Sequence, residues 1–459
     1  MNALPRLIPP RCEGRASGLG RWPGAFGPRF FLALVAGLVW LGPAWWDRRF
    51  GLMIVTWDVL LMVLWWIDWM RLPRPAQLQV AREWSEPAAL GASNTVKLEV
   101  QSEGAVEITA HVEDEVPPCL REELASGSMV IPPARTGQVT YAIVPKERGK
   151  VRMGRAFVRY RSPLQFAERR AVADLAQEIC VYPNLAEAGK LKLYLLRSRQ
   201  IEIEKRLQHR PGRGREFESL REYRDGDELR DVCWTATARR ARLVTKVFRP
   251  ERSQPVWLVI DAGRLMRARA GTFTKLDHAV TAALGLAQVA MAGGDAVGLL
   301  AYGRKVQAQI PTARNAAHLR GLFDELALVR EEPVEADHAR AADILLHAQR
   351  RWALVVWLTD LAETAATPEV IESAARLLGR HLVLFVALGQ PDLETFLARP
   401  PETLTDVYRS VAGMELVQRR EVLLRRLHEQ GALAMEMMPG HLAVGLVNQY
   451  LRIKEESLL

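Results

Sequence analysis

Two long apolar runs stand near the N-terminus of the chain. The first covers Phe30 to Trp46 without a charge, and the second covers Phe50 to Met70 and contains Asp58 and Asp68. A helix of about 17 residues spans roughly 25 Å, which is at the short end of what crosses a hydrocarbon core. Six of the chain's 13 tryptophans lie towards the ends of these runs, where indole rings favour a membrane interface. The pattern predicts a transmembrane helical hairpin over 30–72, with residues 30–70 in contact with the lipid bilayer.

Basic residues on either side of the runs give the expected orientation. Five arginines precede the first run, in a basic arm over 1–29, whereas the short turn between the runs holds two. Arg71, Arg74 and Arg82 follow the second run. Because basic flanks remain on the cytoplasmic side, we expect a two-pass protein of the inner (cytoplasmic) membrane, with its N-terminus and soluble domains in the cytoplasm.

Residues 73–184 alternate between apolar and polar positions in short segments separated by turns. This period of two, interrupted by stretches such as Gly91-Ala92-Ser93-Asn94, is typical of antiparallel strands with one buried face. The segment is therefore predicted to be a β-sandwich domain. Its expected strands include 77–80, 95–100, 106–112 and 139–144.

Residues 253–459 show a different pattern, in which continuous apolar runs alternate with longer helical periods. The runs at 256–260, 296–301, 353–358 and 382–387 are typical of strands buried on both faces. Helices are expected between them, followed by a long helix near 403–430 and a final one near 441–453. This alternation predicts a doubly wound, parallel α/β domain. Between the two soluble domains, residues 185–252 are expected to form a linker and an arginine-rich segment.

Composition limits the classes of protein that remain. An apolar content of 49% excludes a disordered chain. The four cysteines lie far apart and form no CxxC pair, which argues against a disulfide framework and a structural zinc site. The net charge of +9 is modest, and much of it lies in the N-terminal arm and in 205–252. The second cluster could bind nucleic acid or anionic lipid, but solvated faces explain it more simply, and no specific nucleic acid is expected.

Two aspartates follow predicted strands of the α/β domain, at the edge where such sheets bind ligands. Asp261 and Asp360 hold these positions. Their placement resembles the von Willebrand factor A domain, whose metal site uses a D-x-S-x-S loop, a threonine and a second aspartate. In that resemblance Thr312 is the candidate threonine, but Gly263 and Leu265 stand where the serines would be. With two oxygen ligands missing, a degenerate site without a cofactor is expected. A metal-dependent ligand-binding or hydrolytic role for Asp261 and Asp360 is the alternative.

Other catalytic signatures are missing from the sequence. It contains no G-x-x-x-x-G-K-[ST], H-E-x-x-H or G-x-S-x-G pattern, and its nine histidines show no ligand spacing. The chain is therefore expected to be no enzyme.

The segment Glu216 to Arg239 carries the most specific pattern. Asp225-Gly226 is a turn signal, and Asp227 can cap a helix that begins at Glu228. Acids and arginines alternate here, so the segment is either a surface for docking a partner or an ion-paired tie to the α/β domain. It resembles the signature of the family called domain of unknown function 58, at Phe217, Leu220, Arg221, Tyr223, Gly226, Asp227, Arg230, Trp234 and Arg239.

That resemblance implies a function. Members of the family look like von Willebrand A relatives associated with MoxR-type AAA+ ATPases. This chain would then be a membrane-anchored cytoplasmic scaffold or adaptor that docks such an ATPase during the assembly or maturation of a protein complex.

Overall fold

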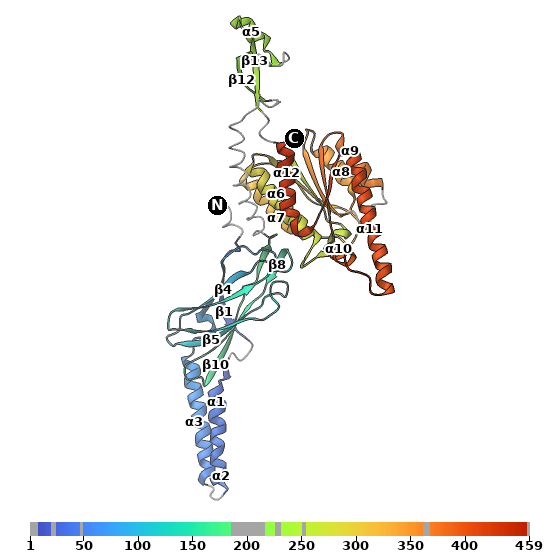
Figure 1. Ribbon diagram of the computed structural model, residues 1–459. Helices are drawn as coiled ribbons and strands as arrows, with labels where there is room; N and C mark the ends of the chain where they lie inside the picture. Colours follow the sequence, from blue (N-terminus) through green and yellow to red (C-terminus); the bar gives the residue numbers. More distant parts are fainter. Residues whose placement is uncertain are drawn as a thin grey trace. The chain divides into compact units, whose positions relative to one another are not determined.

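A computed structural model describes residues 8–19, 24–45, 49–184, 216–224, 231–249, 254–360 and 368–456. The chain divides into two compact units, Met1–Asn184 and Leu185–Leu459 (Figure 1). The boundary coincides with the predicted end of the β domain at residue 184.

The first unit is built on an antiparallel sheet whose strands run in the order β6-β5-β9-β10-β1-β3-β4-β7, with β2 also paired to β10. Strands β8 and β11 form a separate pair. The strands are β1 (Cys12–Gly18), β2 (Gly24–Phe26), β3 (Leu78–Trp84), β4 (Asn94–Ser102), β5 (Ile108–Asp114), β6 (Ala125–Ile131), β7 (Thr136–Ile143), β8 (Gly149–Met153), β9 (Ala156–Arg161), β10 (Ala167–Ala173) and β11 (Gln177–Val181).

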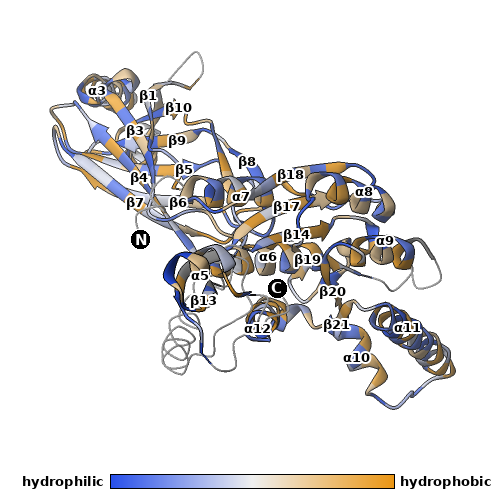
Figure 2. Cartoon of the chain, turned by 90° about the horizontal axis from the view of Figure 1, so that it is seen from above, coloured by the Kyte–Doolittle hydropathy of each residue, from blue (hydrophilic) through white to orange (hydrophobic). Residues whose placement is uncertain are grey.

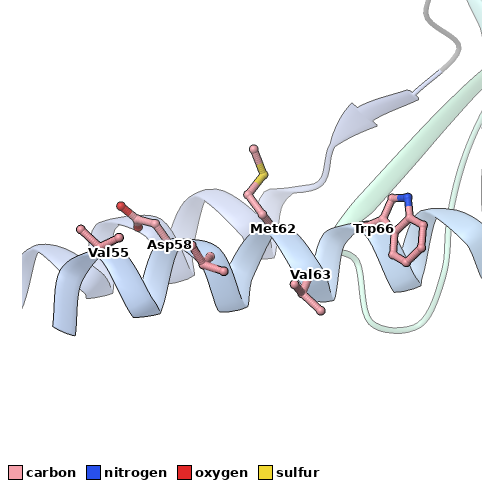
Figure 3. Close-up of a pocket in the computed structure, with 6 residues that line it drawn as sticks. Val55, Asp58, Met62, Val63 and Trp66 are labelled. Atoms are coloured by element: carbon pink, nitrogen blue, oxygen red, sulfur yellow. The ribbon is translucent and has the colours of Figure 1, made fainter. Parts of the chain in front are cut away.

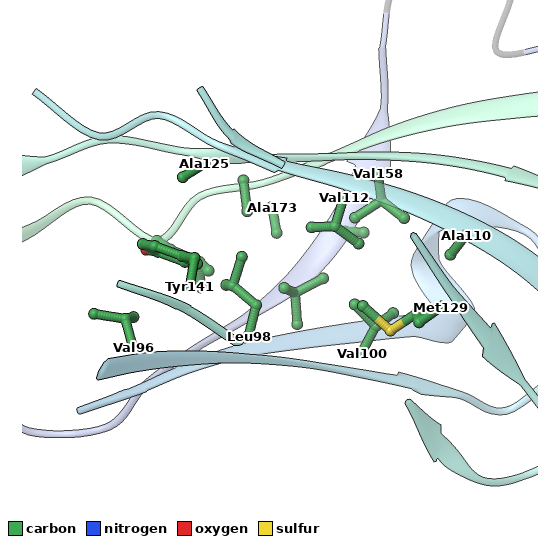
Figure 4. Packing of buried hydrophobic residues seen from close by; sticks show 14 of the residues in the cluster. Val96, Leu98, Val100, Ala110, Val112, Ala125, Met129, Tyr141, Val158 and Ala173 are labelled. Atoms are coloured by element: carbon green, nitrogen blue, oxygen red, sulfur yellow. The ribbon is translucent and has the colours of Figure 1, made fainter. Parts of the chain in front are cut away.

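This sheet curls until its first and last strands meet, so the domain is a near-barrel where the sequence predicted a sandwich. A side chain at Gly127 of β6 would clash with Val139 of β7, at 2.4 Å. Inward-pointing apolar residues of all the main strands fill the interior (Figure 4). One ion pair is buried with them: Arg82 donates to Asp114 and also to the carbonyl oxygens of Leu175 (2.8 Å) and Gly154 (3.0 Å). Its guanidinium is therefore hydrogen-bonded although no water reaches it.

The predicted basic arm over 1–29 is partly structural. Strand β1 pairs with both β10 and β3, and β2 pairs with β10. Residues that the sequence analysis assigned to a basic arm thus form two strands of the β domain. Arginines alternate there with small residues, so the arm lacks the apolar run that marks a strand locally.

A helical arm, residues 28–71, leaves the β domain between β2 and β3 (Figure 1). It consists of α1 (Pro28–Gly37), a 3-10 turn (Leu38–Trp40), α2 (Leu41–Ala44) and α3 (Arg49–Arg71). Helices α1 and α3 lie side by side, and the indole nitrogen of Trp57 donates to the carbonyl of Ala33 at 3.0 Å. Both ends of the arm therefore return to the same β domain.

The prediction of two membrane spans requires correction. Within the described residues, one helix is long and apolar enough to cross a membrane, at 51–77. Only 11% of its apolar window is buried, so it is not the core helix of a soluble fold. The first segment falls short because its α-helix ends at Gly37, before Gly42 and Pro43.

The α/β domain of the second unit has a six-stranded sheet in the order β18-β17-β14-β19-β20-β21. The strands are β14 (Pro255–Asp261), β17 (Ala296–Tyr302), β18 (Val306–Ala313), β19 (Leu354–Thr359), β20 (Leu382–Leu388) and β21 (Leu433–Met437). Its helices are α6 (Lys275–Ala292), α7 (Ala316–Leu328), α8 (His338–Ala348), α9 (Pro368–Leu378), α10 (Pro391–Leu397), α11 (Leu404–Glu429) and α12 (Leu442–Glu455).

This order is that of a doubly wound fold, with β14 as the first strand near the centre. Helices α6, α7 and α12 lie on one face of the sheet, and α8, α9 and α11 lie on the other (Figure 1). The expected purely parallel sheet is in fact mixed, because β18 pairs antiparallel to β17 at the edge. The predicted helices near 403–430 and 441–453 are confirmed as α11 and α12.

Candidate functional site

Asp261 and Asp360 lie together at the carboxyl edge of the α/β sheet, as the sequence predicted. Asp261 ends β14 and Asp360 follows β19, and these two parallel strands are neighbours. From β14 the chain passes through α6 to β17, which pairs with one side of β14. It later returns as β19, which pairs with the other side of β14. This edge is therefore the topological switch point, where doubly wound sheets usually bind ligands.

Both carboxylate oxygens of Asp261 are occupied by the protein. One accepts from the backbone N–H of Gly263 at 2.7 Å, and the other accepts from the Thr359 hydroxyl at 2.6 Å. The side chain is buried. Burial raises the pKa of Asp261, although the nearby His338 and the two hydrogen bonds act in the opposite direction. Asp261 thus fixes the turn after β14 and is not open to a substrate.

Asp360 is neutralised by two side chains from distant helices. Lys275 donates to one oxygen at 2.5 Å, and Arg420 donates to the other at 3.2 Å. Lys275 also donates to the carbonyl of Leu388 at 3.3 Å, and Arg420 bonds Glu436 at 2.5 Å. Burial lowers the pKa of Lys275, an effect that the Asp360 carboxylate opposes. Three buried residues, Lys275, Asp360 and Arg420, together with the exposed Glu436, form what we call the buried ion cluster.

The buried ion cluster places two cationic side chains, balanced by two carboxylates, at the edge where the sequence predicted a degenerate metal site. Gly263 stands in place of a serine, and a side chain there would meet the backbone nitrogen of Ala336 at 2.9 Å. Among the described residues, no group of three or more His, Cys, Asp or Glu side chains is placed to hold a metal ion. A divalent cation would have to displace Lys275 and Arg420, so the residues do not fit one.

Thr312, the third residue of the predicted metal site, lies elsewhere. It is near the end of β18, which runs antiparallel to β17 and pairs Ala313 with Val297 at the start of β17. That is the amino edge of the parallel strands, opposite Asp261 and Asp360. The prediction for Thr312 fails because it assumed that strand β18 runs parallel to its neighbours.

The signature segment forms a small unit of its own. Strand β12 (Glu216–Glu222) pairs antiparallel with β13 (Val244–Arg249), and helix α5 (Trp234–Arg240) lies between them in the chain. Leu220 and Arg221 lie on β12, and Tyr223 donates its backbone N–H to Leu243 at 2.9 Å. Phe217 belongs to β12 as well.

Trp234 and Arg239 lie on α5 and are exposed, the indole by 65%. Glu222 pairs with Arg242 at 3.2 Å within this unit. Gly226, Asp227 and Arg230 lie outside the described residues, as do the helix start predicted at Glu228 and part of the basic stretch 205–252.

The structure adds an exposed apolar face on α11 that the sequence reading passed over. Leu404, Val407, Val411 and Met414 are 42–72% exposed and follow one another at three- and four-residue steps. The opposite side of the helix is buried through Leu423 and Leu427. This alternation of three and four residues is the spacing of a helix–helix seam. We call these four residues the α11 seam.

The chain is similar to several known proteins. Residues 219–425 match the model of the family described as "Protein of unknown function DUF58", which confirms the resemblance drawn from the sequence. Uncharacterized proteins of Mycobacterium tuberculosis and Mycobacterium bovis are 27% identical over 183 residues, which is 39% of this chain. The match spans 57% of the length of these relatives.

Two solved structures are also similar to parts of this chain. A conserved hypothetical protein, BatB, from Bacteroides thetaiotaomicron covers 30% of this chain and 69% of its own, at 17% identity and a TM-score of 0.26. The VWA domain of SpRpn10 covers 43% and 95%, at 13% identity and a TM-score of 0.26.

Proposed function

We propose that this DUF58 protein is a membrane-tethered adaptor that docks a partner, a MoxR-type AAA+ ATPase, in the assembly or maturation of a protein complex. The family resemblance supplies the class of partner. The α11 seam is the observation that carries the docking role.

A row of exposed apolar side chains at seam spacing favours an amphipathic helix as the docked element. In Figure 2, α11 carries hydrophobic positions among hydrophilic ones along its length. Glu415 and Arg419, which follow the row along the helix, pair with each other at 2.5 Å. The proposed occupant is a helix of the ATPase that lies along this row.

The contacts of Asp261 and Asp360 at the carboxyl edge of the sheet favour a binding role over a catalytic one. Asp261 and Asp360 hold hydrogen-bonded, buried positions, and the buried ion cluster occupies the place of a metal. A hydrolase would need a nucleophile or a metal-activated water at this edge. A docking protein needs only the rigid sheet that carries α11.

The helical arm supports the tether. Its α3 helix has the length and apolarity of a span, and its outer side is open. Because β1 and β2 precede the arm and β3 follows it, the whole β domain lies on the side of the bilayer from which the arm enters. The basic flanks favour the cytoplasm for that side, by the positive-inside rule.

The test of docking is co-purification of the detergent-extracted, full-length chain with its partners. Val411→Asp with Met414→Asp places two charges in the α11 seam and is expected to reduce recovery of an AAA+ ATPase at least tenfold. Val130→Asp with Val144→Asp is the matched control, because both valines are exposed on the β domain. We expect this control to recover the ATPase as the unmodified chain does.

Two results would overturn the proposal. Equal recovery from all three chains would exclude the α11 seam as the docking face. If no AAA+ ATPase accompanies the unmodified chain, the partner itself is wrong.

A further inference from the structure

The foot of the helical arm is fixed rigidly to the β domain. Asp68, near the end of α3, accepts from the hydroxyl of Ser162 at 2.5 Å and from the backbone N–H groups of Phe166 (3.1 Å) and Ala167 (2.9 Å). Trp65 donates to the carbonyl of Ala25 on β2 at 3.4 Å. Asp68, one of the two acids in the second apolar run, is thus buried in the protein, and it sets the level at which the arm begins.

The free length of the arm then sets the distance between the β domain and the membrane. From Trp65 to Arg49, α3 has 16 residue steps, which amount to about 24 Å. A hydrocarbon core is about 30 Å thick. An arm that is no longer than the hydrocarbon core is thick leaves no gap between the β domain and the membrane surface. The foot of an inserted arm therefore lies at the level of the lipid headgroups.

Aromatic side chains surround the foot, as expected at that level. The rings of Phe26 and Phe30 stack at 4.4 Å, Phe26 meets Trp65 at 5.0 Å, and Trp65 stacks with Trp69 at 6.2 Å. Amphipathic rings prefer the membrane interface.

Arginines gather at the same end of the β domain. On adjacent strands β9 and β10, three of them share the carboxylate of Glu168: Arg161 at 2.7 Å, Arg170 at 3.3 Å and Arg159 at 4.0 Å. Their side chains remain 30–55% exposed. Glu168 directly follows Ala167, which bonds Asp68 of the arm. Three guanidinium groups on one carboxylate leave an excess of two positive charges beside the foot.

Further arginines flank the two helices themselves. Arg29 is the second residue of α1 and donates to the carbonyl of Pro163 at 3.3 Å. Arg71 ends α3 and Arg74 follows it, and both are exposed. We call the set of six the basic collar: Arg29, Arg71, Arg74, Arg159, Arg161 and Arg170.

We propose that the basic collar binds the headgroups of anionic phospholipids and holds the β domain against the membrane surface. This inference rests on the proposed membrane tether. Arginine forks match phosphate oxygens in pairs, and the excess charge has no acidic partner on the same strands beyond Glu168. The partner surface is lipid because the arm's length brings these arginines to the depth of the phosphates.

The test uses the purified full-length chain in detergent, mixed with phosphatidylglycerol or with phosphatidylcholine, and follows its Tm. Phosphatidylglycerol is expected to raise Tm above phosphatidylcholine, because a ligand that binds the folded state stabilises it. The difference should shrink as NaCl rises from 50 to 500 mM. Each arginine near an anionic surface contributes a factor of about five in affinity.

Two variants remove the charge in different ways. The first combines Arg159→Gln, Arg161→Gln and Arg170→Gln with Glu168→Gln, so that no buried carboxylate is left unpaired. The second replaces the exposed Arg29, Arg71 and Arg74 by Gln. We expect an apparent affinity for phosphatidylglycerol at least tenfold lower in each. The control, Lys150→Gln with Arg152→Gln, removes two positive charges from β8, at the end of the β domain remote from the arm (Figure 1), and should behave as the unmodified chain.

Several results would overturn the proposal that the basic collar binds anionic phospholipids. Equal Tm values in the two lipids would do so, as would equal loss of the effect in the control. The same rise with inorganic phosphate at matched concentration would identify a free-anion site instead. A carbonate wash of native membranes tests the tether separately, since a chain released by carbonate refutes the tether whatever the lipids do.

Discussion

At the scale of single residues, the main feature is a lysine at the N-terminus of a helix, where positive charge is unfavourable. Lys275 is the first residue of α6, and the N-terminus of a helix carries partial positive charge. It is fully buried there, so its ammonium group depends on Asp360 and the carbonyl of Leu388. An ammonium group supplied by the protein therefore lies at the carboxyl edge of the sheet.

Replacing Lys275 with Met should destabilise the α/β domain by about 3–5 kcal/mol, because it leaves Asp360 and Glu436 facing a single buried arginine. The double variant Lys275→Met with Asp360→Asn should recover much of this loss. Thermal unfolding of the detergent-solubilised chain provides the measurement. A single variant as stable as the unmodified chain would show that the cluster is not a coupled unit.

The stability of the α/β domain should also depend on pH through His381. This residue is buried just before β20, and burial together with the nearby Arg380 lowers its pKa from 6.5. The unfolded chain therefore binds a proton more readily than the folded one. The stability that neutral His381 contributes is present above pH 6.5 and is lost as the pH falls through the folded-state pKa.

The variant His381→Phe should accordingly show a smaller fall in Tm between pH 7 and pH 5 than the unmodified chain. Parallel Tm profiles for the two chains would mean that His381 does not titrate differently on folding.

Prediction from the sequence succeeded at this scale for residues that end strands. Asp261 and Asp360 directly follow apolar runs, which is a local signal. Lys275 and Arg420 were not found, because they lie 85 and 60 residues from Asp360 in the chain and no local pattern marks them.

At the scale of elements, α3 carries two aspartates with opposite surroundings. Asp68 is buried at the foot of the arm, whereas Asp58 is exposed and lines a shallow groove with Val55, Met62 and Trp66 of the same helix (Figure 3). Both looked alike in the sequence, as acids within an apolar run. Their difference comes from the connection between β9 and β10, where Ser162, Phe166 and Ala167 donate hydrogen bonds to Asp68.

Asp68→Ala should therefore lower the stability of the first unit by about 1–3 kcal/mol, since it leaves buried N–H groups of Phe166 and Ala167 without an acceptor. Asp58→Ala is the control on the same helix and should leave Tm within about 1 °C. Tryptophan fluorescence during heating can follow both variants. Equal effects would mean that Asp68 does not anchor the arm.

The long periodic elements were predictable, and the irregular ones were not. Helices α11 and α12 have continuous helical patterns and were found within a few residues. Strands β1 and β2 were missed because they join a sheet through pairing with β3 and β10, and a short strand of mostly small and charged residues has no signature of its own. The first apolar run was taken for a full span, although Gly42 and Pro43 limit its helix.

At the scale of the whole molecule, the arm and the α11 seam belong to different units of the chain. This separation is what an adaptor requires, because one unit can be fixed while the other meets a partner. The division at residue 184 was predictable from the change of pattern there. The closure of the near-barrel was not, because it depends on how strongly the sheet curls.

Removal of the arm should convert the protein to a soluble form. Residues 31–64 can be replaced by a Gly/Ser linker of about eight residues, which reaches about 25 Å when extended. The residues of the foot and strands β1 and β2 are kept. We expect this chain in the supernatant after ultracentrifugation, with a near-native circular dichroism spectrum. Retention in the membrane pellet would locate the tether elsewhere in the chain.

The position of the arm inside the β domain also governs how the protein is made. Ser17 of β1 bonds Val172 of β10, which follows it by 155 residues. At about 5–20 residues per second, a ribosome adds that stretch in about 8–30 s. The arm leaves the ribosome long before β10 exists, so under the proposed tether bilayer insertion precedes closure of the sheet. The first two strands would then stay at the membrane surface, with unpaired edges, until β3 and β10 are made.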